Sequence, residues 1–153
     1  MEPVFDDGET EVWSTHLVPG ADFTSPRTNR DFAALIVILD PAVPPDSQAA
    51  ISERIVRNGC RYAVCTGHAC STWETSVDLA YLAQDAYWSP PTDRFVMTTS
   101  HQDESLEEAI EHFHLRTAFE HFAPTLFLAV VIGGSTAEYE SVRARLRSQW
   151  NAA

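Results

Sequence analysis

The sequence predicts an α/β protein: a three-layer sandwich with a mainly parallel sheet of four to five strands and a flavodoxin- or Rossmann-like βαβαβαβα order. Two observations predict this class. Four apolar runs recur along the chain, and a helical pattern follows each of them; the runs are 32–39, 62–65, 95–97 and 126–132. Strands that alternate with helices of this length favour right-handed crossovers, and these place helices on both faces of a parallel sheet.

The first apolar run has the composition of a central strand. Residues 32–39 are continuously apolar and rich in branched side chains, whereas a strand with one wet face would alternate. Prolines end this run, and the pattern predicts a helix from about Asp46 to Asn58-Gly59.

The three later strands are expected over residues 61–66, 94–98 and 126–132. Their helices have apolar stripes, with Trp150 closing the last stripe. A Ser with Glu three residues later predicts capping boxes at Ser71 and Ser135. We expect the strand order 2-1-3-4, with a crevice between the first and third strands.

Residues 1–30 read as an N-terminal arm, and residues 31–153 as a single α/β domain. The arm carries prolines, glycines and many acidic residues, with one plausible strand over Val12–Val18. The pattern leaves open whether this strand joins an edge of the sheet or is partly disordered.

The charge balance restricts the partners. The formal net charge is −12, from 22 acidic residues and ten cationic ones, all arginine. An acidic surface repels nucleic acid and anionic membranes and attracts a basic protein partner. The alternative is that the acidic residues only keep the protein soluble. The absence of lysine excludes a Walker A loop and Schiff-base chemistry, and we expect no cofactor.

We expect a cytoplasmic protein. No apolar run approaches the roughly 20 residues needed to cross a bilayer, and acidic residues replace the basic start of a signal peptide. Three cysteines, an odd number, then indicate reduced thiols at 60, 65 and 70.

Small polar residues follow the predicted strands, where open α/β folds place their ligand sites. Because parallel strands put every strand-to-helix loop at the same edge, we expect these residues to surround one cleft. The candidate ligand-binding residues are Thr66, His68, Cys70, Thr99, His101, Glu104, Gly134 and Ser135.

Three kinds of chemistry are conceivable at this edge. Cys70 lies near a predicted helix N-terminus that would stabilise a thiolate, and His68 could serve as its base. His68 and His101, with Cys70 and Glu104, could bind zinc, although their spacing matches no recognised metal motif and no metal is predicted. The N–H groups of residues 133–135 could cradle a small anion, but no histidine follows Ser135 to complete a hydrolase triad.

The segment Thr98-Thr99-Ser100-His101 with the acidic residues and helix after it resembles a segment of an uncharacterised family of small bacterial α/β proteins. That family has a Thr-Thr-x-His segment with tryptophan where this chain has Ser100. The resemblance implies a bacterial source and no activity.

Two functions therefore follow from the sequence. The first is a non-enzymatic acidic binding or accessory protein that recognises a basic partner or a small, for example anionic, ligand at the carboxyl edge of the sheet. The alternative is a small hydrolase or transferase that uses Cys70 or a His68/His101 pair, with zinc as an option.

Overall fold

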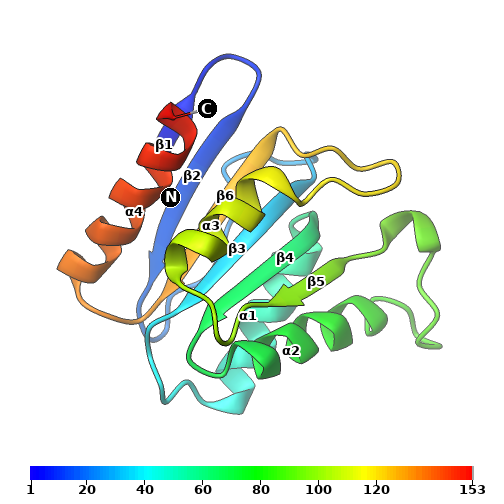
Figure 1. The fold of residues 1–153 in the computed structure, drawn as a ribbon. Coiled ribbons are helices and arrows are strands. Elements are labelled where there is room, and N and C mark those ends of the chain that lie inside the picture. The colour runs from blue at the N-terminus through cyan, green and yellow to red at the C-terminus, as the bar shows by residue number, and fades with distance from the viewer. Residues whose placement is uncertain (153) are drawn as a thin grey trace.

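The computed structural model describes residues 1–152 and contains one six-stranded sheet with helices on both faces (Figure 1). The strands are β1 (Glu2–Asp6), β2 (Glu11–Leu17), β3 (Phe32–Ile38), β4 (Cys60–Gly67), β5 (Met97–Ser100) and β6 (Leu126–Ile132). The helices are α1 (Pro45–Arg57), α2 (Cys70–Leu82), α3 (Leu106–Leu115) and α4 (Thr136–Asn151), with a 3₁₀ turn at Thr92–Arg94.

The sheet is mixed but mostly parallel. β1 pairs antiparallel with β2, and every other neighbouring pair is parallel. The α/β class is thus confirmed, but the sheet has more strands than expected because residues 1–30 contribute two. The strand expected at Val12–Val18 is β2, which lies between β1 and β6 rather than at an edge.

The expected strand order was wrong. The observed order is β1-β2-β6-β3-β4-β5, so the first strand of the repeating pattern, β3, lies between β6 and β4 and does not touch β5. Hydrophobic periodicity detects strands but does not tell in which direction each crossover steps. The crevice expected between the first and third strands therefore does not exist.

Two separate cores explain the unbroken apolar runs. α1 and α2 pack on one face of the sheet with Ile36 and Val130, whereas α3 and α4 pack on the other with Leu35 and Ala129. Successive side chains of a strand point to opposite faces, so a strand covered on both faces is apolar at every position. All seven residues of β3 and of β6 are buried.

Two local predictions needed correction. The third strand begins at Met97, later than expected, because the 3₁₀ turn occupies part of the approach. Ser71 does not cap α2; the helix begins at Cys70 after Ala69, which is left-handed at φ 52°. The capping box of Ser135 with Glu138 is confirmed.

The last helix is fixed to the N-terminal strands by a polar network as well as by its apolar stripe. The Tyr139 hydroxyl lies 2.8 Å from the hydroxyl of buried Ser14 on β2. Arg143 donates to the same Ser14 oxygen at 3.1 Å and to the carbonyl of Pro3. Val142, Leu146 and Trp150 are buried, so the apolar stripe that Trp150 closes packs against the sheet as expected.

Candidate functional site

The sequence-predicted site residues lie at or just after the carboxyl ends of strands, but they fall into separate groups. Thr66 is near the end of β4 and His68 follows it, Thr99 is near the end of β5 and His101 follows it, and Ser135 follows β6. β6 and β5 are separated by β3 and β4, which corresponds to about 14 Å at the usual strand spacing. Within residues 1–152, no hydrogen bond or ring contact joins exposed His68 to buried His101.

His101 forms the densest polar cluster of this edge. Its Nδ1 contacts the Glu104 carboxylate, and its Nε2 lies 3.0 Å from the Thr99 hydroxyl. Its ring packs edge-on against His112 on α3, with centroids 4.6 Å apart. Burial lowers the pKa of His112, and neighbouring His101 lowers it further.

The cluster continues inward to Tyr62 on β4. The Tyr62 hydroxyl lies 2.9 Å from Nε2 of His112, and burial raises the pKa of Tyr62. The sequence indicated His101, Thr99 and Glu104 but not His112 or Tyr62. Those two come from other elements, and only the crossing of α3 over β4 brings them together.

The cysteines are part of the core. Cys70 is 1% exposed and Cys65 is fully buried among the side chains beneath α1 and α2. Burial raises the pKa of Cys60 to about 12 and raises that of Cys65 as well. All three are free thiols, and none has the exposed, electropositive surroundings of a reactive cysteine.

The turn after β6 is already hydrogen bonded within the chain. The Ser135 N–H donates to the Glu138 carboxylate, and the Gly133 N–H donates to the carbonyl of Leu17. A carboxylate therefore occupies the place where an anion would bind the Ser135 N–H group. This arrangement disfavours the anion cradle considered from the sequence.

The carboxyl ends of β3 and β6 are held together at the point where the chain leaves them in opposite directions. The N–H groups of Leu39 and Asp40 both donate to the carbonyl of Ile132, at 2.9 and 3.1 Å. β3 then leads to α1 on one face, while β6 leads to α4 on the other. Such a divergence of neighbouring strands is where open α/β sheets form ligand crevices.

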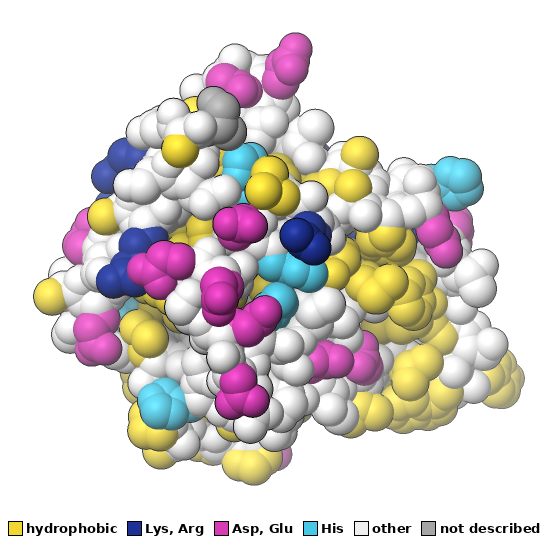
Figure 2. All heavy atoms as spheres, viewed as in Figure 1, with side chains coloured by type: hydrophobic (Ala, Val, Ile, Leu, Met, Phe, Trp, Pro, Cys, Tyr) yellow, Lys and Arg dark blue, Asp and Glu magenta, His cyan; other side chains and the backbone are white. Residues whose placement is uncertain are grey.

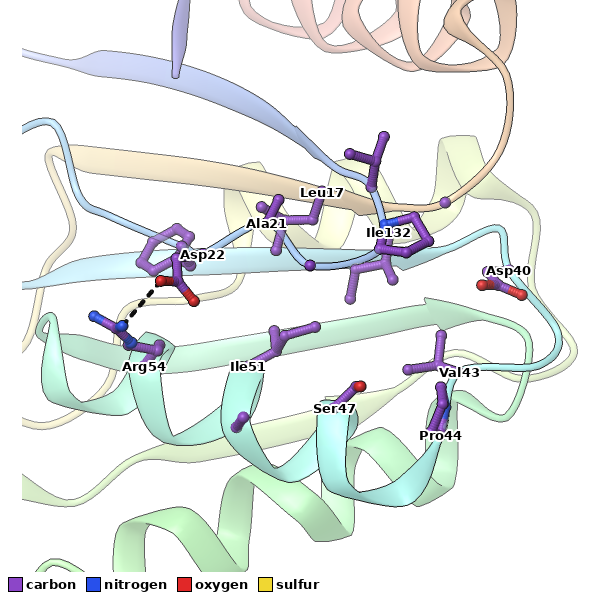
Figure 3. Close-up of a pocket in the computed structure, with 16 residues that line it drawn as sticks. Leu17, Ala21, Asp22, Asp40, Val43, Pro44, Ser47, Ile51, Arg54 and Ile132 are labelled. Carbon is purple, nitrogen blue, oxygen red and sulfur yellow. Dashed lines mark hydrogen bonds and ion pairs between the residues drawn. The ribbon is translucent and has the colours of Figure 1, made fainter.

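A pocket of about 400 Å³ opens beside this divergence (Figure 3). It lies between α1 and the segment that connects β2 to β3, and Asp40, which follows β3, and the end of β6 contribute to its wall. The lining is mainly apolar and includes Leu17, Val18, Pro19, Ala21, Phe23, Val43, Pro44, Ala50, Ile51 and Ile132.

Polar groups mark the two ends of this pocket. At one end Arg54 donates to Asp22 at 3.1 Å, and at the other lies Asp40, whose carboxylate accepts the Ala42 N–H at 2.8 Å (Figure 3). Arg54 and Asp22 are both largely exposed, so this ion pair is weak. The sequence analysis missed the pocket because residues 19–23 carry no strand or helix pattern. Buried Phe23, together with partly buried Ala21, anchors this segment to the core.

No group of three or more metal-ligating side chains within residues 1–152 could hold a metal ion. In the same range, no helix is both long and apolar enough to cross a membrane.

The fold and the pocket define an α/β protein with a small-molecule-sized cavity at the divergence of two central strands. Residues 12–149 match the model of a domain of unknown function, DUF7684, and the chain belongs to this family. This agrees with the resemblance to an uncharacterised family and brings no activity with it. The comparison with curated proteins gives no match.

Proposed function

We propose that this protein is a non-enzymatic binding protein that holds a small, mainly apolar ligand between α1 and the β2–β3 connection. The observation that carries the proposal is the position and lining of the pocket. Its volume of about 400 Å³ lies within the usual range of about 300–1,000 Å³ for small-molecule sites, which are mostly apolar with a few placed polar groups.

The strand order supports the same site. The four strands that alternate with helices lie in the order β5-β4-β3-β6, which is 3-2-1-4 in chain order. Doubly wound nucleotide-binding folds contain the same order of their first four strands. They bind ligands at the carboxyl ends of strands 1 and 4, which correspond to β3 and β6 here. We propose a Rossmann-like arrangement on this ground, with a cytoplasmic location that suits three unpaired thiols.

The charges at the pocket favour an amine over an anion. Arg54 is already paired with Asp22, whereas Asp40 forms no ion pair within residues 1–152. A ligand with an apolar body and an amino group can place its body against Ile51 and Val43 and its charge near Asp40.

Calorimetric titration with indole, phenethylamine and phenylacetate tests this function. Phenethylamine should bind most tightly and phenylacetate least. Ala50→Phe places a ring in the pocket from an exposed helix position and should abolish binding. Ala49→Phe, next to it on α1 and outside the pocket lining, is the matched control and should bind normally. Equal binding by the two variants would contradict the proposal.

A second candidate function rests on the Glu104–His101–Thr99 arrangement. A carboxylate at Nδ1 and a hydroxyl at Nε2 of one histidine is the order of groups in acyl-transfer triads. In this alternative, Thr99 would be the nucleophile, in place of buried Cys70 or a His68/His101 pair. Hydrolysis of p-nitrophenyl acetate that Thr99→Val abolishes and Ser100→Ala preserves would favour this enzyme.

A further inference from the structure

The open edge of the sheet at β5 lies outside the pocket and combines an unpaired strand, exposed aromatic side chains and negative charge. Within residues 1–152, β5 is the last strand of the sheet and pairs only with β4. The His101 N–H donates to the carbonyl of Cys65. In a parallel pair the backbone groups of alternate residues point to the same neighbour, so the N–H and C=O groups of Met97 and Thr99 point toward β4. The N–H and C=O groups of Thr98 and Ser100 therefore face outward, where a further strand would pair.

Large apolar side chains are exposed beside this edge. Tyr87 is 89% exposed, Trp88 58% and Phe95 39%, all within the connection from α2 to β5. Figure 2 shows hydrophobic side chains gathered on the side of the molecule where this connection and β5 lie. A contiguous exposed apolar patch beside an open strand is typical of an interaction surface.

An ordered turn holds Tyr87 and Trp88 on the surface. The Asp85 carboxylate accepts the N–H groups of Tyr87 and Ser89, and its carbonyl accepts that of Trp88. Trp88 itself has a left-handed backbone at φ 57°, which is uncommon for a bulky residue. The turn thus keeps both rings on the surface despite a conformational cost.

The elements around this edge carry half of the net negative charge of the protein. Residues 60–116, which include β4, α2, β5 and α3, contain nine Asp and Glu residues and three arginines, a net charge of −6 against −12 for the whole chain. Two of these arginines, Arg61 and Arg94, are paired with Asp31. Two copies of this surface would repel each other, whereas an extended basic segment would be attracted and could pair with β5.

We propose that the β5 edge binds an extended, arginine- or lysine-rich segment of another protein, which adds to the sheet as a seventh strand. Its apolar residues would contact Trp88 and Phe95, and its basic residues would face the surrounding carboxylates. This site adds a second binding surface and does not depend on the pocket or its ligand.

A short acetylated peptide of alternating arginine and valine, titrated by fluorescence anisotropy, tests this surface. The wild-type protein should bind it more weakly as salt rises and should not bind the same peptide with glutamate for arginine. Ser100→Pro removes an outward N–H and fills the open edge, so it should weaken binding about tenfold or more. Ser100→Val keeps the N–H and is the matched control.

Hydrogen exchange gives a readout that needs no variant. Bound peptide should slow exchange at the Thr98 and Ser100 amides, which face the open edge. Unchanged exchange at both, or equal binding by Ser100→Pro and Ser100→Val, would overturn the proposal. Sedimentation that finds a dimer in the wild type and a monomer in Ser100→Pro would overturn it too, because the edge would then bind a second copy.

Discussion

Gly133 and Asp40 approach so closely that a side chain on Gly133 has no room: an added Cβ would lie 2.5 Å from the Cβ of Asp40. Gly133 also has a left-handed backbone, at φ 74°. Together these features let the chain leave β6 beside the end of β3 and so form one wall of the pocket.

Gly133→Ala should therefore destabilise the protein and weaken ligand binding. Gly8 has φ 91° and no atom near an added Cβ, so Gly8→Ala should lose only the unfolding free energy that the left-handed backbone costs. We expect Gly133→Ala to lose about 1–3 kcal/mol more unfolding free energy than Gly8→Ala, measured by denaturant titration. Equal losses would mean that the contact with Asp40 is relieved easily.

Leu146→Ala tests whether α4 is a structural element. Leu146 is completely buried beneath α4, and its truncation should cost about 2–5 kcal/mol of unfolding free energy. Arg147→Ala, one position along on the exposed face, should change stability little. A melting temperature that Leu146→Ala leaves unchanged would show that α4 contributes little to the core.

The buried cysteines predict a thiol assay with a clear result. The native protein should react very slowly with a disulfide reagent at pH 8, because burial raises the pKa of Cys60 to about 12 and that of Cys65 too. Unfolding in denaturant should then expose three reactive thiols. Rapid labelling of Cys70 in the folded protein would instead favour the alternative function, a hydrolase or transferase that uses Cys70.

Stability should fall as the solution becomes mildly acidic. Burial lowers the pKa of His112 and His114 below the ordinary value of 6.5, so the unfolded chain takes up protons before the folded one. Their effect is absent above pH 6.5 and grows as pH falls below it. Denaturant titrations from pH 8 to pH 5 should show this decrease.

His114→Phe separates that titration from packing. His114 stacks on Trp150 at 4.2 Å, and phenylalanine can keep this stacking without taking up a proton. The decrease in stability below pH 6.5 should therefore be smaller in this variant. A decrease of the same size would assign the pH dependence to other groups.

The sequence predicted the fold well where the signal is local. The apolar runs of β3 and β6 are unbroken because these strands are buried on both faces. The apolar stripe that ends at Trp150 follows from the burial of one face of α4. The strand order and the roles of residues 1–30 depend on pairing between distant segments, which periodicity does not encode. β2, for example, alternates in burial and would suit an edge position as well as its place between β1 and β6.

The candidate site was predictable only as an edge. The topology of a parallel sheet placed His101 and Ser135 correctly at its carboxyl end, but it did not say which neighbours share a cavity. The pocket depends on Phe23, whose burial fixes the β2–β3 connection against α1. A single phenylalanine in a polar segment carries no periodic signal.

Chemical-shift mapping of methyl groups in the presence of phenethylamine locates the bound ligand on the protein. The proposed site predicts that the shifted methyls are those of Val43, Ile51 and Ile132, which line the pocket, and that Ala50→Phe removes these shifts. Shifts centred instead on methyls near His101, or no shifts at concentrations that bind other apolar pockets, would contradict the assignment of this pocket as the ligand site.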